Sequence, residues 1–346
     1  MSRTVSFKCP SCGGYLEFDP EGQQFECQYC GHQISEAELQ RLSQEKEEDH
    51  GGAAEEGSLK AYHCQMCGAE IVTGDTTAAT RCYYCHQPVV LADRLEAEFR
   101  PDGVIPFRLD KKGAEDAFKQ FVAKKKFIDK AFFSTAQLED FSGVYYPYWY
   151  GDLEGEASFE GEGTRVSVAS GPKQTVTTTR YFRVEREGSL RYTRLIRKGL
   201  SAADRTLSEG IHPYNLDEMK PFASGYLSGF LAERRDVEEA SAQAEMAQDA
   251  QDYAEQLMKA GHSYDSLRGT TSFRLKKANL RSLLLPAWVL TYRGKGGKEP
   301  YYYMMNGQTG EVCGKLPINK AKLGAWALGI YAAVLGLLCV GGALLW

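Results

Sequence analysis

Eight of the ten cysteines form four pairs, and two residues separate the cysteines of each pair. Fourteen residues separate the first pair from the second, and the same gap recurs between the third and fourth pairs at a shift of 55 residues. A two-residue gap lets both thiolates face one ion, and four thiolates form a tetrahedral zinc site that is closed to substrate. The sequence therefore predicts two structural zinc ions. The predicted ligands are Cys9, Cys12, Cys27 and Cys30 for one ion, and Cys64, Cys67, Cys82 and Cys85 for the other.

Paired cysteines also serve iron–sulfur clusters, redox-active dithiols and disulfides, and the first two stay open as alternatives to zinc. Disulfides are disfavoured because the N-terminal segment lacks the apolar run of a signal peptide, and cytoplasmic chains keep their cysteines reduced. His63 and His86 adjoin the second set of cysteines. Since four thiolates already complete a tetrahedral site, we expect neither imidazole to bind the metal.

Two short modules position these cysteines, a zinc ribbon at residues 1–35 and a second at residues 61–95. Modules of this size bury little apolar surface, so we expect the metal to supply folding free energy. Residues 36–60 are acidic and contain several glycines, which predicts a flexible linker that leaves the ribbons free to move relative to each other. The formal charge of the chain is −5, which favours protein binding over nucleic-acid binding.

Residues 100–317 predict an α+β domain with antiparallel β-hairpins and helices. An amphipathic pattern predicts a helix over residues 110–130, and a capping box at 236–239 predicts a second helix that ends near Gly261. We expect the second helix to pack through a thin apolar stripe. The stripe consists of Val237, Ala240, Ala244, Ala247, Ala254 and Leu257.

β-prone residues begin near Gly143 and recur in two later stretches. Glu187-Gly188-Ser189 predicts a hairpin turn within residues 175–197, and residues 283–292 and 300–305 predict another hairpin. The stretch around 175–197 is locally basic. Its cations either pair with nearby acids on a solvated face or form a patch for anionic lipid headgroups. These basic residues are Arg180, Arg183, Arg186, Arg191, Arg194, Arg197 and Lys198.

The C-terminal residues 323–346 contain no charged residue and no proline. As a helix rising about 1.5 Å per residue, they predict one transmembrane span across a hydrocarbon core of roughly 30 Å. A buried core helix is the alternative. Trp326 and Trp346 lie near the two ends of the predicted span, where indole rings favour the headgroup level. Lysines precede the span and none follows, so we expect a single-pass protein of the cell membrane with the bulk of the chain in the cytoplasm. These lysines are Lys315, Lys320 and Lys322.

Small residues in the same C-terminal segment recur at a spacing of four. Ala325, Gly329 and Ala333 share one helix face, where small side chains let two backbones approach closely. The spacing predicts self-association through Gly329 and Ala333. The alternative is that the spacing has no role, because glycine and alanine are frequent in apolar helices.

Several motifs resemble one bacterial family, the YdjG-like double zinc-ribbon proteins, which carry a membrane anchor. The cysteine knuckles themselves resemble zinc ribbons of the TFIIB and rubredoxin-like kind. The resemblance implies two structural zinc sites and association with phage-shock-type membrane-stress assemblies through protein contacts. The motifs are VIPF at 104–107, GVYYPYWYGDLEG at 143–155, LLPAWVLTYR at 284–293 and YYYMMNGQTGEVCGKLP at 301–317.

These observations favour a tail-anchored adaptor that recruits cytoplasmic or membrane protein partners. The alternative is a membrane-tethered nucleic-acid-binding protein in replication or transcription. We do not expect an enzyme, because the chain lacks the HExxH, GxSxG and GxxxxGK[ST] motifs. We expect His212 and His262 to be surface residues, and Cys313 and Cys339 to be packing thiols.

Overall fold

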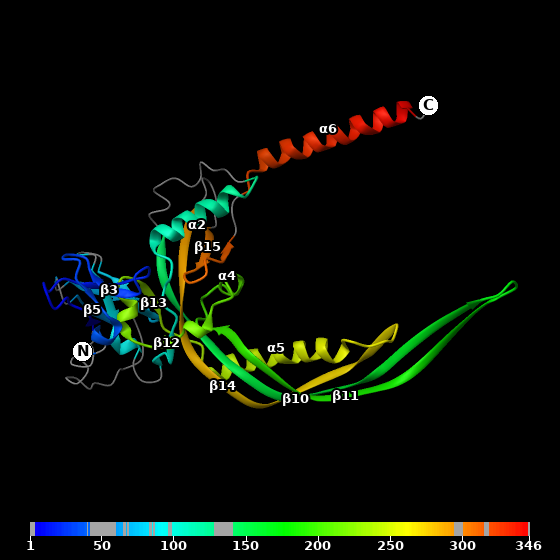
Figure 1. The fold of residues 1–346 in the computed structure, drawn as a ribbon, viewed down its shortest axis with the longest axis horizontal. Helices are drawn as coiled ribbons and strands as arrows, with labels where there is room; N and C mark the ends of the chain where they lie inside the picture. Colours follow the sequence, from blue (N-terminus) through cyan, green and yellow to red (C-terminus); the bar gives the residue numbers. More distant parts are fainter. Residues whose placement is uncertain are drawn as a thin grey trace.

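The computed structural model describes a β-rich molecule with a ribbon-bearing end and a long curved arm (Figure 1). The helix α6, Lys320–Leu344, projects away from the rest of the chain (Figure 1). Predictions that fall on the remaining residues, including most of the linker, lie outside the described part. The described residues are 4–39, 41, 60–64, 67, 69–82, 85, 87–95, 99–127, 141–293, 300–314 and 318–344.

An 11-stranded sheet forms the centre of the described chain. Its main path runs β1-β8-β7-β13-β10-β14-β15-β16, with β11 beside β10, β9 beside β14, and β12 beside β9. The strands of this sheet are β1 (Thr4–Val5), β7 (Thr77–Arg81), β8 (Pro88–Leu91), β9 (Gly103–Val104), β10 (Ser142–Ser170), β11 (Thr175–Lys198), β12 (Lys220–Pro221), β13 (Leu231–Glu233), β14 (Ser266–Arg293), β15 (Pro300–Asn306) and β16 (Val312–Gly314).

Two smaller sheets and several helices complete the described fold. The small sheets are β2-β3-β4 and β5-β6. Their strands are β2 (Leu16–Asp19), β3 (Gln24–Cys27), β4 (Gln33–Ile34), β5 (Lys60–His63) and β6 (Glu70–Thr73). The helices besides α6 are α2 (Lys111–Ala123), α4 (Arg205–Gly210), α5 (Glu239–Lys259) and the 3-10 turns η1 (Ala92–Leu95), η4 (Leu216–Glu218) and η5 (Ser224–Leu227).

The expected α+β domain at residues 100–317 is wrong, because the described part of this region is mostly β and its sheet is mixed. β13 runs parallel to β10, and β9 runs parallel to β14. These parallel strands are two or three residues long, too short to carry a periodic pattern in sequence. The hairpin expected from 283–292 and 300–305 is confirmed as the antiparallel pair β14–β15.

The arm consists of β10, β11 and β14, with α5 along its concave side (Figure 1). Alternate residues of β10 are buried from Gly151 to Phe159, as expected for a strand with one covered face. α5 covers that face with residues spaced four apart. They are Ala242, Met246, Ala250, Ala254 and Met258. Of the apolar stripe predicted for this helix, Ala254 is buried in this row, whereas Leu257 is 56% exposed.

The turn predicted at Glu187-Gly188-Ser189 is wrong, because β11 continues through these residues and Gly188 pairs with Ala157 of β10. The turn lies at the far end of the arm, where the Gly171 N–H donates to the Gln174 carbonyl at 2.8 Å. Continuous pairing with β10 keeps Gly188 extended, although glycine and its polar neighbours favour a turn in isolation.

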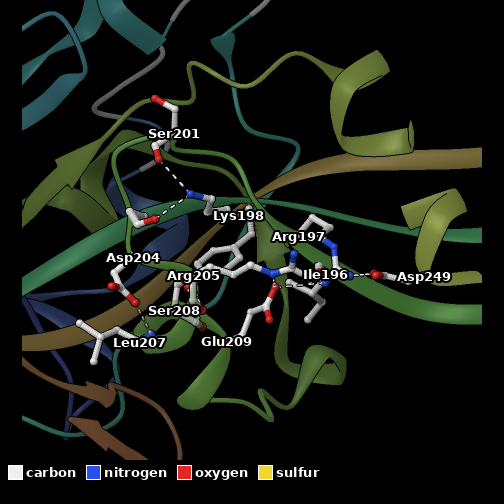
Figure 2. Close-up of polar contacts among 12 residues, drawn as sticks. Ile196, Arg197, Lys198, Ser201, Asp204, Arg205, Leu207, Ser208, Glu209 and Asp249 are labelled. Carbon is white, nitrogen blue, oxygen red and sulfur yellow. Dashed lines mark hydrogen bonds and ion pairs between the residues drawn. The ribbon is translucent and has the colours of Figure 1, made fainter. Parts of the chain in front are cut away.

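Ion pairs at the base of the arm tie β11 to two helices (Figure 2). Arg197 contacts Glu209 of α4 and Asp249 of α5, and its side chain is 13% exposed. Lys198 donates to the carbonyls of Ser201 and Ala203 at 2.9 and 2.7 Å (Figure 2). Arg183, Arg191 and Arg194 also contact acids, so pairing with nearby acids accounts for much of this basic stretch.

The transmembrane helix predicted at residues 323–346 is wrong. Among the helices of the described chain, none combines the length and the apolar character that a membrane span needs. α6 carries Lys320 and Lys322 in its first turn. The single-pass membrane localisation, and the orientation inferred from flanking lysines, are wrong with it.

Candidate metal centres

The first set of cysteines converges on one point. The Sγ atoms of Cys9 and Cys30 are 3.7 Å apart, and those of Cys12 and Cys27 are 3.5 Å apart. All four sulfur atoms lie within 4.8 Å of one another. A tetrahedron with Zn–S bonds of about 2.3 Å has sulfur atoms about 3.8 Å apart, so this geometry fits zinc. The four cysteines are free thiols.

Tight turns at two knuckles aim the sulfur atoms of the first set. The N–H of Gly13 donates to the Cys9 carbonyl, and the N–H of Gly31 donates to the Cys27 carbonyl, both at 2.9 Å. Gly13 has φ +74° and Gly31 has φ +67°, a region in which a side chain would be strained. Gly68 holds the same place in the second set as Gly13 does in the first, and it lies outside the described residues.

The second set has the same geometry. Cys64 and Cys85 have Sγ atoms 3.6 Å apart, and those of Cys67 and Cys82 are 3.7 Å apart. All four sulfur atoms again lie within 4.8 Å of one another. His63 is an exposed strand residue whose carbonyl accepts a hydrogen bond from Thr4 at 3.0 Å, while His86 lies outside the described residues.

The cysteine thiols of the two sets do not all ionise alike. Burial opposes ionisation of Cys9, but hydrogen bonds from the backbone N–H groups of Cys12 and Ser11 outweigh it and lower the pKa to about 6. Burial raises the pKa of Cys85 to about 12, and neighbouring thiols add to this effect against a backbone hydrogen bond at Gln87. A metal must therefore displace protons from the set, so its affinity falls as the pH falls. When bound, zinc supplies cross-linking and folding free energy rather than reactivity.

The two ribbons contact each other directly, contrary to the expected freedom between them. β1 precedes the first cysteine and pairs with β8 of the second ribbon through Thr4–Leu91 and Val5–Val90. Arg81 of β7 contacts Glu17 of β2 at 3.5 Å. These contacts fix the ribbons against each other at a shared interface.

The first ribbon also packs on the main sheet. The Ser228 hydroxyl donates to the Leu16 carbonyl at 2.6 Å, and the Phe18 N–H donates to the Ser228 carbonyl at 3.1 Å. The rings of Phe18 and Phe25 lie 5.2 and 5.7 Å from that of Tyr226. The first ribbon and the main sheet therefore share one apolar core, which β7 and β8 enter through Ala78, Ala79 and Val90. Most buried apolar residues around the second cysteine set form a cluster of their own.

The remaining candidate residues have structural positions. His212 is half-buried between the rings of Tyr148 and Tyr214, so it is not the open surface residue that the sequence predicted. Burial lowers its pKa, and the nearby Arg197 adds to this against the opposing charge of Glu209. His262 is exposed as expected. Half-buried Cys313 donates to the Thr206 carbonyl at 3.5 Å, and the side chain of Cys339 lies outside the described part.

Sequence reasoning missed two buried polar residues near the second set. Arg94 is 6% exposed and donates from Nε to the Tyr62 hydroxyl at 2.8 Å, which ties η1 to β5. Tyr15 belongs to the first ribbon but lies beside the cysteines of the second. Neither residue belongs to a recognisable sequence motif, so only the packing of distant segments reveals its role.

The fold and the two sites define a class: a protein with two four-cysteine sites that fit zinc ribbons, built onto a mixed β-sheet. The chain is 30% identical over 333 residues to a Bacillus subtilis protein described as uncharacterized protein YdjG, and the match covers 94% of each chain. The chain therefore belongs to the YdjG family. No family model matches it, so none supports a TFIIB-type assignment, and no solved structure matches it.

Proposed function

We propose that this protein is an adaptor in which the two zinc ribbons and the main sheet form one rigid body and the arm binds protein partners. The main support is that each set supplies four cysteine ligands, so a tetrahedral metal ion bound there has no open position for substrate. A closed metal site stabilises a binding scaffold and does not catalyse. The resemblance to YdjG-like proteins makes components of a phage-shock-type stress assembly the first partners to test.

The arm tip, residues 166–179, is the surface we assign to partner binding. β14 pairs with β10 only as far as Thr164, so beyond that point the described arm has two strands. Val166, Val168 and Val176 are 47%, 62% and 48% exposed. A two-stranded hairpin is only marginally stable in water, and free strand edges bind extended segments of other chains.

Charge around the arm tip favours an acidic partner. Residues 165–180 include Arg165, Lys173 and Arg180 and contain no acidic residue. Complementary charge speeds association and selects partners. We therefore propose that the tip binds an acidic, extended protein segment. The alternative of nucleic-acid binding is weaker, because many arginines nearer the base contact acids of the chain itself.

The test compares the full chain with a variant in which residues 166–179 are replaced by Asn-Gly. Arg165 and Arg180 pair directly, so a two-residue turn can close the shortened arm. Cross-linking in cells followed by binding measurements with each purified partner should show at least about tenfold weaker binding by the shortened arm. The near-isosteric variant V166T/V168T tests how much the two valine side chains contribute to partner binding. Unchanged partner binding would refute the role of the arm tip, and salt-dependent gel shifts would support the nucleic-acid alternative.

A further inference from the structure

Tyr15 links the first ribbon to the metal site of the second. It follows the first knuckle and is 3% exposed. Tyr15 and Cys64 line one small cavity of about 10 Å³. The other walls are formed by β1 and by residues 87–89 at the start of β8. A residue of one ribbon therefore faces a cysteine of the other.

The hydroxyl of Tyr15 is buried without a hydrogen-bond partner in the described part of the chain. Buried hydroxyl groups normally find a partner, because leaving one unpaired loses its hydrogen bonds to water. A tyrosine hydroxyl ordinarily ionises at about pH 10, so it carries its proton at neutral pH and is available as a donor.

A metal-bound set of four thiolates is the natural acceptor for this donor. Four thiolates carry more negative charge than one zinc ion neutralises, and Cys64 and Cys82 are buried. Hydrogen bonds to such ligands orient them and tune the metal, and they slow attack by protons and chelators. Neutral thiols in the same place are weak acceptors.

We infer that Tyr15 is a positioning residue for the second metal site: its hydroxyl donates a hydrogen bond to the thiolates there, directly or through the single water that the cavity can hold. The interface then couples the two ribbons, because a folded first ribbon is needed to keep Tyr15 in place. Loss of metal from the first site weakens metal binding at the second. The inference depends on metal binding and is independent of partner binding by the arm.

The test measures zinc release from the full chain to a colorimetric chelator. Variants with Cys9 and Cys12, or Cys64 and Cys67, changed to serine assign the release phases to the two sites. Tyr15→Phe keeps the ring and removes the donor, and it should speed release from the second site about tenfold. The charge-transfer bands of cobalt bound at the second site should also shift. The control is Tyr303→Phe, another fully buried tyrosine, whose hydroxyl contacts Met305 Sδ at 3.9 Å, and it should leave release unchanged.

A double-mutant comparison separates this hydrogen bond from simple packing. Once Cys9 and Cys12 are serine, adding Tyr15→Phe should have little further effect on the second site. If Tyr15→Phe lowers folding, 3-fluorotyrosine at position 15 replaces it, since a more acidic hydroxyl should slow release. Wild-type release and cobalt spectra in both Tyr15 variants would overturn the inference.

Discussion

The two ribbons carry the same cysteine spacing but are built into the molecule in different ways. The first keeps β2, β3 and β4 in a separate sheet, which packs on the rest of the fold through side chains such as Phe18, and contributes only the two-residue β1 to the 11-stranded sheet. The second keeps only the β5–β6 hairpin apart, and its other strands, β7 and β8, belong to the 11-stranded sheet. A repeat in sequence is therefore not a repeat in architecture.

The strands of the two ribbons also differ in how deeply they are buried. All four residues of β8 are buried, whereas β2 alternates between buried and half-buried positions. A strand buried on both faces lies within a larger body, and an alternating strand has one open face. We therefore expect the second metal site to support the main sheet and the first to support mainly its own ribbon.

The largest expected effect comes from single cysteine substitutions in the two ribbons. Structural zinc contributes on the order of 10 kcal/mol of apparent binding free energy at pH 7, so losing a site should unfold what depends on it. Cys82→Ser should increase hydrogen exchange in β7, β8 and the adjoining β13. Cys9→Ser should increase exchange mainly within residues 4–39. Exchange that spreads equally into β13 in both variants would contradict the difference between the ribbons.

A smaller loss should follow from detaching the first ribbon from the sheet. Phe18 is 4% exposed, and its ring lies 5.3 Å from that of Phe25 and 5.2 Å from that of Tyr226. Phe18→Ala should lower the free energy of unfolding by about 3–5 kcal/mol in a denaturant titration. Tyr181→Ala is the control, since Tyr181 is 67% exposed, and it should change stability by less than about 0.5 kcal/mol. Equal losses in the two variants would show that the ring cluster does not attach the ribbon.

The smallest effect concerns the strand that joins the second ribbon to the arm. Glu233 of β13 pairs with Thr77 of β7, and burial raises its pKa against favourable contacts with Thr76 and Arg94. A raised pKa means that the folded state holds the proton more tightly. The stabilisation that comes from protonated Glu233 is therefore fully present when the pH is below the pKa of Glu233 in the unfolded chain. It is lost as the pH rises through the higher pKa of Glu233 in the folded chain.

Glu233→Gln removes this titration, so its stability should fall less than that of the wild type as the pH rises from acidic to neutral. Thermal unfolding across that range measures the effect. The matched control is Glu160→Gln on an exposed part of the arm, which should follow the wild-type profile. A wild-type profile in Glu233→Gln would show that this carboxyl is not perturbed by burial.

Local spacing predicted the metal sites because each pair of cysteines needs only one tight turn. The structure brings all eight predicted ligands into two clusters. The helix at α2 was also predictable, since Asp110 caps it and Phe118 lies on its buried face. Each of these features depends on residues close together in sequence.

The features that sequence reasoning missed depend on distant segments. The pairing of β1 with β8 joins residues more than 80 positions apart, and Tyr15 gains its role only through that contact. The continuous β11 overrode the turn preference of Gly188 because β10 pairs along its whole length. The apolar C-terminal segment was judged by its composition, whereas α6 begins earlier and includes two lysines. Self-association through Gly329 and Ala333 stays a prediction.

Metal analysis of the full chain, purified without added metal, tests the central claim most directly. Native mass spectrometry and elemental analysis of the same sample should give two zinc ions per chain, with all eight ligand cysteines protected from alkylation until a chelator is added. Replacing Cys9 and Cys12 with serine should leave close to one zinc ion per chain. Iron in place of zinc, a single zinc in the unaltered chain, or disulfides between these cysteines would contradict the account.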